Sequence, residues 1–135
     1  IEGKKMDVYN NGNMYRDFTY IDDIVNSIKS LIRVIPKNTK KSNSSKIDSL
    51  SSVAPFRVVN IGNSNKVKLI DFIKEIEKVL GKKAICNYMP LQKGDVPKTI
   101  ANTNLLKKLT KRKPKINFKE GVRKFVEWYL DYYKK

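Results

Sequence analysis

The chain has 135 residues, of which 29 are Lys or Arg and 13 are Asp or Glu, so its formal net charge is +16. Histidine is absent and there is a single cysteine, which excludes histidine acid–base catalysis, an internal disulfide and an ordinary zinc site. Hydrophobic residues make up 40% of the chain, which predicts globular material, and no apolar run approaches the length of a membrane span.

The positive charge is scattered over the sequence, with denser stretches at residues 36–46 and 107–115. Neither stretch has interleaved aromatic residues that could stack on bases. We interpret most of this charge as solvated surface, and we expect no nucleic-acid partner. A basic nucleic-acid-binding module and an anionic small-molecule ligand remain the alternatives.

The first elements in chain order are predicted to be β structure. Residues 6–12 fit a short strand and an Asn-Gly turn, and Phe18 to Ile21 alternate as a strand does. Asp22 or Asp23 then suits the N-cap of a helix. The apolar stripe of that helix, ended by Pro36, comprises Ile24, Val25, Ile28, Leu31, Ile32 and Ile35.

The middle of the chain divides into a polar and an apolar part. Residues 36–55 are rich in Ser and Lys and predict a flexible surface loop, with a domain linker as the alternative. Residues 56–62 form a continuous apolar run, which is typical of a buried parallel strand. The next helix, with Gly81 just past its end, carries Leu69, Phe72, Ile73, Ile76, Val79 and Leu80 on one face.

The last third begins with a predicted strand at residues 83–90, where Cys86 is expected to be a buried structural thiol. A loop at 91–99 follows, and then a short helix capped by Asn102 or Thr103.

Asn117 and Glu120 have the spacing of a capping box and predict the start of the final helix. We interpret its apolar stripe as core packing, with a partner-binding face as the alternative; the stripe comprises Phe118, Val122, Phe125, Val126, Tyr129 and Tyr132.

Two places carry residues suited to ligand binding. Arg16 precedes a predicted strand, where its fork of donors could hold phosphate or could pair with Asp17. Gln92 and Asp95 flank Gly94 in a loop, where an amide and a carboxylate could hold phosphate and ribose, or could merely form a turn. The residues alone leave both choices open, and no glycine-rich phosphate loop is present.

Four stretches carry a family resemblance: "MDVYNNGNMYRDFTYIDDIV", "FRVVNIGNSNKVKLIDFIKEIEKVLG", "LQKGDVPKTIANTNLL" and "NFKEGVRKFVEWYLDYY". In this order they resemble the C-terminal part of NAD-dependent nucleotide-sugar epimerases of the extended short-chain dehydrogenase/reductase family, and the glucuronate 4-epimerases most of all. The stretches "RDFTYIDDIV" and "VVNIGN" are shared with related dehydratases, decarboxylases and hexose 4-epimerases.

The resemblance implies an α/β fold in which residues 1–135 form a partial C-terminal nucleotide-sugar-binding region. The chain does not begin with Met, and we expect it to be a fragment without the N-terminal NAD-binding Rossmann domain. The helix after Asp23 and the strand from Phe56 to Ile61 resemble pieces that extend the sheet of that domain. A cytoplasmic, homodimeric full-length protein is the further expectation.

The resemblance also implies an activity: interconversion of UDP-glucuronate and UDP-galacturonate through a 4-keto sugar, with NAD bound mainly by the missing domain. The alternatives are a UDP-glucuronate decarboxylase, a sugar dehydratase or a UDP-hexose 4-epimerase. Because the family's Tyr-x-x-x-Lys pair is absent, no catalytic residue is expected here, and the fragment alone should be inactive.

The resemblance assigns roles to five substrate-binding residues. Arg16 matches the position that contacts the diphosphate, while Gln92 and Asp95 match the loop that holds phosphate and ribose. Tyr9, or the backbone near Val8, lies where the family strand touches the uracil. Asp17 is then expected to support the loop internally, and no metal is implied.

Overall fold

A computed structural model describes residues 1–37 and 48–135, so half of the predicted loop at 36–55 lies outside the described residues. The described elements, in chain order, are β1 (Met6–Val8), the 3-10 helix η1 (Tyr9–Gly12), β2 (Tyr15–Arg16), α1 (Ile21–Leu31), β3 (Val67–Lys68), α2 (Leu69–Leu80), β4 (Cys86–Tyr88), α3 (Asn104–Thr110) and α4 (Phe118–Tyr133). No helix among them is long and apolar enough to cross a membrane.

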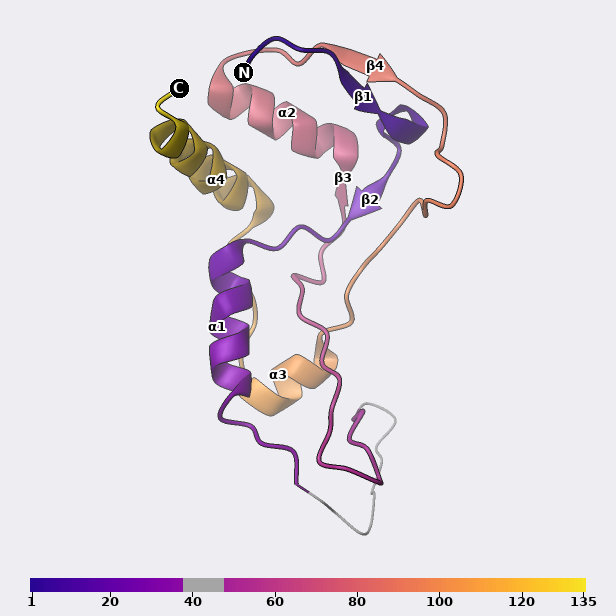
Figure 1. Cartoon of the computed structure of the whole chain (residues 1–135), viewed down its shortest axis with the longest axis vertical. Helices are drawn as coiled ribbons and strands as arrows, with labels where there is room; N and C mark the ends of the chain where they lie inside the picture. Colours follow the sequence, from indigo (N-terminus) through magenta and orange to yellow (C-terminus); the bar gives the residue numbers. More distant parts are fainter. Residues whose placement is uncertain (38–47) are drawn as a thin grey trace.

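The described strands form two small two-stranded sheets. β1 pairs with β4 in parallel, with Met6 opposite Cys86, and β2 pairs with β3 antiparallel, with Arg16 opposite Val67. Helices α2 and α4 pack together beside the strands, whereas α1 and α3 pack against each other at the opposite end of the molecule (Figure 1). The buried apolar residues are Val8, Met14, Val67, Ile73, Leu105, Leu106, Val122 and Val126.

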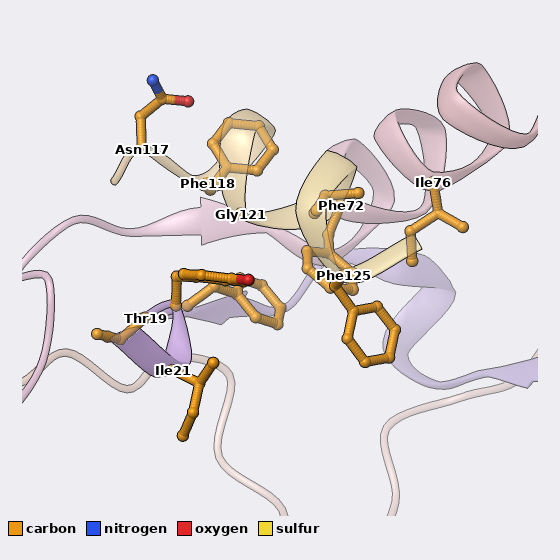
Figure 2. A pocket seen from close by; sticks show the side chains of 11 residues that line it. Thr19, Ile21, Phe72, Ile76, Asn117, Phe118, Gly121 and Phe125 are labelled. Atoms are coloured by element: carbon orange, nitrogen blue, oxygen red, sulfur yellow. The ribbon is translucent and has the colours of Figure 1, made fainter. Parts of the chain in front are cut away.

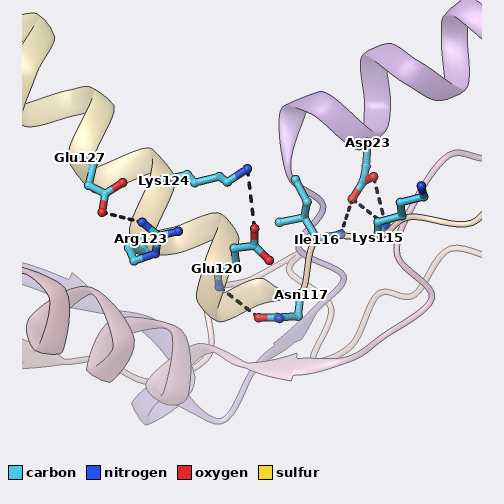
Figure 3. A network of polar contacts seen from close by, with 8 residues as sticks. All are labelled: Asp23, Lys115, Ile116, Asn117, Glu120, Arg123, Lys124 and Glu127. Carbon is cyan, nitrogen blue, oxygen red and sulfur yellow. Dashed lines mark hydrogen bonds and ion pairs between the residues drawn. The ribbon is translucent and has the colours of Figure 1, made fainter.

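Local signals predicted the end of α2 and the start of α4 well. Gly81 ends α2 in the left-handed conformation, with φ at 64°, as expected of a residue without a Cβ. The side chain of Asn117 accepts a hydrogen bond of 3.0 Å from the backbone N–H of Glu120, which confirms the predicted cap of α4 (Figure 3). Both features depend on residues within one helical turn of each other.

The start of α1 differs from the prediction. The segment from Phe18 to Tyr20 is not a strand, and Phe18 instead stacks on Phe72 of α2 with ring centroids 4.0 Å apart. Tyr20 occupies the N-cap position, and no side chain caps the helix there. The predicted cap by Asp22 or Asp23 is therefore wrong.

Asp23 has a longer-range structural role. It is buried, and its carboxylate accepts hydrogen bonds from the backbone N–H groups of Lys115 (3.0 Å) and Ile116 (2.9 Å), as Figure 3 shows. Since these donors lie in the segment that leads into α4, Asp23 ties the beginning of α1 to that segment.

The apolar run at residues 56–62 is not a strand, so the prediction of a buried parallel strand there is wrong. Phe56 and Val58 are exposed, and no strand pairs with this run among the described residues. Asp48 holds the start of the run through a 2.9 Å ion pair with Arg57. A strand needs a partner for its backbone groups, and the described part of the chain provides none.

Two of the predicted apolar stripes are only partly buried. On α4, Val122 and Val126 are buried, but Phe125 and Tyr132 are 50% and 65% exposed, so the core interpretation holds for one side of the stripe only. The predicted stripe of α1 is exposed at Val25, Ile28, Ile32 and Ile35, as is Ile21 at the start of the helix. Cys86 is half-buried, less than predicted.

The carboxylate of Glu77 links the end of α2 to the lead into β4 and predicts a pH dependence. Its pKa is lowered from the ordinary glutamate value by the Lys83 ammonium at 2.9 Å and by the backbone N–H of Ala84 at 2.8 Å. A lowered folded-state pKa adds stability above the unfolded-state pKa, and that stability is lost as the pH falls through the folded-state value.

We therefore expect Glu77→Gln to lower the melting temperature at pH 7, and the difference from the unsubstituted chain to shrink as the pH falls below about 4.3. Melting followed by circular dichroism from pH 7 to pH 3 measures this. Glutamine keeps an acceptor for Ala84, so a pH-independent difference would contradict the ionic explanation.

Candidate functional site

The end of β2 and the loop at residues 92–97 meet and form the candidate site. The backbone N–H of Tyr15 donates to the carbonyl of Pro97 (2.8 Å), and the N–H of Thr99 donates to the carbonyl of Tyr15 (3.1 Å). These two bonds hold the loop beside β2. They bring together Arg16 and Asp95, which are separated by 79 positions in the sequence.

Arg16 forms its ion pair with Asp95 and not with Asp17. The distance from Nη2 of Arg16 to Oδ1 of Asp95 is 2.9 Å, and Nη1 donates to the carbonyl of Tyr15 at 2.9 Å. The two side chains are 28% and 34% exposed, so the pair is accessible to a ligand. A guanidinium has five N–H donors, and these two bonds orient it while leaving donors for another anion.

The loop itself is a tight turn. The backbone N–H of Asp95 donates to the carbonyl of Gln92 (3.1 Å), and Gly94 has a φ of 87°, which only glycine adopts easily. Oδ1 of Asp95 also accepts from the N–H of Val96 at 2.8 Å. Gln92 is exposed on the same turn. The two interpretations of this loop, a turn and a ligand site, are thus compatible, because the turn leaves the side chains of Gln92 and Asp95 accessible to a ligand.

Asp17 holds neighbouring segments of the chain in place beside the site, which is the supporting role expected for it. Its carboxylate accepts hydrogen bonds from the backbone N–H groups of Asn63 (3.0 Å), Ser64 (2.9 Å) and Ala101 (3.1 Å). One side chain therefore fastens two other segments to the end of β2. A Cβ at Gly62 would lie 2.5 Å from Cβ of Ala101 and 2.9 Å from Asp17, so this junction requires glycine.

Val8 and Tyr9 lie apart from the ion pair. Val8 is buried in β1, opposite Tyr88 of β4, and its carbonyl accepts a hydrogen bond from Met89 (3.0 Å). Tyr9 is half-buried at the start of η1. The structure brings Arg16, Gln92 and Asp95 into one region and leaves these two residues on the neighbouring sheet.

A separate apolar cavity of about 260 Å³ lies between the segment before α1 and helices α2 and α4 (Figure 2). Phe18, Phe72, Phe118 and Phe125 contribute to its lining. Such a lining suits apolar groups and not phosphate. This cavity was not predicted from the sequence, since each of these residues also fits an ordinary core position.

Comparison with known proteins finds nucleotide-sugar enzymes among the proteins that the chain resembles. No protein-family model matches it. It is 48% identical over 135 residues to protein CapI of Staphylococcus aureus, covering 100% of this chain and 40% of the relative. It is 47% identical over 134 residues to a probable UDP-glucuronate 4-epimerase of Rhizobium meliloti, covering 98% of this chain and 39% of that protein.

The fold agrees with this similarity. A UDP-glucuronic acid 4-epimerase from Bacillus cereus, solved with UDP-glucuronic acid and NAD, superposes with a TM-score of 0.72 at 27% identity, over 98% of this chain and 36% of the other. The chain corresponds to the C-terminal part of an extended short-chain dehydrogenase/reductase. It spans about two fifths of the length of these two curated relatives.

The expectation that α1 and the segment from Phe56 to Ile61 extend the sheet of an N-terminal half stays a prediction. It is consistent with the exposed apolar stripe of α1 and with the missing strand at residues 56–62.

Proposed function

We propose that this chain is the substrate-binding part of a UDP-glucuronate 4-epimerase and that it holds the nucleotide half of the UDP-sugar. The observation that carries the proposal is the meeting of Arg16 with the Gln92–Asp95 turn at the end of β2. The sequence similarity to a probable UDP-glucuronate 4-epimerase supports this choice of substrate.

The geometry suggests how a nucleoside diphosphate would bind. Without ligand, Asp95 neutralises Arg16 at 2.9 Å. A diphosphate would displace the Asp95 carboxylate from the Arg16 guanidinium, because phosphate oxygens match the fork of N–H donors. The released carboxylate of Asp95 would then accept hydrogen bonds from the two ribose hydroxyls. Gln92 would donate its amide to a phosphate oxygen. Val8 and Tyr9 would contact the uracil from the neighbouring sheet.

Holding the nucleotide in this way would serve the reaction at the sugar. Interactions with the uridine and the diphosphate leave the sugar ring free to turn over while the substrate stays bound, so binding energy from a remote group serves the chemistry. The reacting atoms would then lie against residues of the N-terminal half, outside this chain.

We further propose that the whole protein uses NAD, which would supply the hydride acceptor and donor for the reaction. The residues present do not fit this cofactor, because the chain has no glycine-rich dinucleotide motif. The chain by itself should therefore neither bind NAD tightly nor turn over substrate. A homodimer of the whole protein is part of the same proposal.

Product analysis of the longer protein that contains this chain tests the reaction. With UDP-glucuronate as substrate, we expect UDP-galacturonate to form in a reversible equilibrium, with no net reduction of NAD. Formation of UDP-xylose would indicate a decarboxylase instead, and turnover of UDP-glucose alone would indicate a hexose 4-epimerase. Either result would overturn the epimerase proposal but would leave the UDP-binding role of the chain to be tested separately.

A further inference from the structure

Two segments of the chain, one including most of α1 and the other including α3, carry positive charge without any acid. Residues 96–119 contain eight basic residues and no Asp or Glu; the basic residues are Lys98, Lys107, Lys108, Lys111, Arg112, Lys113, Lys115 and Lys119. Residues 24–37 contain Lys29, Arg33 and Lys37, again with no Asp or Glu. Scattered surface lysines would be interspersed with acids, as they are on α2 and α4.

The fold brings these two acid-free segments together. α1 packs on α3 (Figure 1), and a groove of about 420 Å³ runs between them. Lys29 and Arg33 line it from α1, and Arg112 lines it from the residues after α3. A second depression of about 350 Å³ on α3 is lined by Lys107 and Lys111, among others.

The groove is not neutralised from within the chain. Residues 38–47 contain no Asp or Glu, so all carboxylates belong to the described residues. Among those residues, Lys29, Arg33 and Arg112 form no ion pair. The two acids that flank residues 24–37 in sequence are engaged elsewhere, since Asp23 binds backbone N–H groups and Asp48 pairs with Arg57.

Favourable interaction with the helix dipoles explains only part of this charge. Lys29 lies in the last turn of α1, and Lys107 lies in the last turn of α3, where a cation stabilises the free carbonyls. Arg33 and Arg112 lie beyond the two helix ends, so their position in the groove is not required by either helix.

The lining of the groove indicates the class of ligand. Two guanidinium groups and an ammonium suit phosphate oxygens, and no aromatic side chain lines the groove to stack on a base. The hydroxyl groups of Ser30 and Thr110 are already bonded to backbone carbonyls. Recognition would therefore depend on charge, with the amide of Asn26 as an additional donor.

We propose that the α1–α3 groove is a binding site for a small anion that carries several phosphate groups. It is distinct from the site at Arg16, which lies at the end of β2. It also lies on a different side of α1 from the exposed stripe of Ile21, Val25 and Ile28, because residues advance 100° per position around a helix. A domain docked on that stripe would leave the groove open.

Calorimetric titration of the chain with inorganic tripolyphosphate tests the proposal. We expect saturable binding that weakens as KCl is raised from 50 to 300 mM, as charge-dominated recognition requires. The double variant Arg33→Ala/Arg112→Ala should weaken binding at least about tenfold. The matched control Lys5→Ala/Lys74→Ala removes the same charge from exposed residues outside the groove and should change it less than about twofold.

Equal losses in the two double variants would show that net charge and not the groove attracts the anion, and would overturn the proposal. So would binding of duplex DNA without saturable binding of tripolyphosphate. Arg33 and Arg112 are exposed, so both double variants should keep the melting temperature of the chain. Carrying out all of these titrations in the Arg16→Ala background removes the phosphate contact proposed for UDP, which keeps this test separate from the UDP site.

Discussion

Replacement of Asp17 by alanine will lower the free energy of unfolding by about 3 kcal/mol, because three backbone N–H groups lose a charged acceptor at once. Two of these bonds are partly buried, so water will not replace them fully. Urea denaturation followed by tryptophan fluorescence, using the single Trp128, measures the change.

Two variants show whether the effect comes from this set of hydrogen bonds. Asp22→Ala removes an exposed acid from the first turn of α1 and should cost only about 0.5 kcal/mol through the helix dipole. Asp17→Asn keeps one acceptor oxygen but turns an amide N–H₂ toward backbone donors, so its stability should lie close to that of Asp17→Ala. If Asp17→Ala were no less stable than Asp22→Ala, the supporting role of Asp17 would be refuted.

The ion pair between Arg16 and Asp95 predicts opposite effects on two ligands. Asp95→Asn should tighten binding of inorganic pyrophosphate, because the carboxylate no longer competes for the guanidinium 2.9 Å away. The same variant should weaken binding of UDP, because the amide replaces the proposed acceptor of the ribose hydroxyls. Calorimetry with the two ligands on the same protein measures both effects.

Arg16→Ala should weaken both ligands, by roughly 30-fold or about 2 kcal/mol, which is typical of a hydrogen bond to a charged group. Arg16→Lys is the matched control, because it keeps the charge but loses the fork of donors. Its affinity for both ligands should lie between that of Arg16→Ala and that of the unsubstituted chain. If Asp95→Asn shifted both ligands in the same direction, the carboxylate would not be acting both as competitor for Arg16 and as ribose contact.

The parts of the fold that the sequence predicted correctly depend on near neighbours. The end of α2 at Gly81 and the cap of α4 at Asn117 are set within one turn of helix, and both were predicted. Arg16 and Asp95 were also expected to act together, from their residue types and the family pattern. Their direct ion pair was not predicted, since nothing local relates residues 79 positions apart.

The incorrect predictions concern residues whose partners are distant or absent. Asp23 has the spacing of a helix cap, yet its acceptor oxygens are used by Lys115 and Ile116, more than 90 positions away. Residues 56–62 have the composition of a buried strand, but strand formation depends on a neighbour that the described chain does not contain. Composition shows a tendency to form a strand and does not reveal whether a partner is present.

The pairing of β1 with β4 has a consequence for how the chain folds. Met6 pairs with Cys86, and Tyr15 pairs with Lys98, so the first strands have pairing partners some 80 residues further along the chain. Closing such large loops costs chain entropy before the contacts repay it, and it slows folding relative to helix formation. During synthesis, α1 and α2 can therefore coil early, whereas the region around Arg16 can assemble only after the turn that carries Asp95 has left the ribosome.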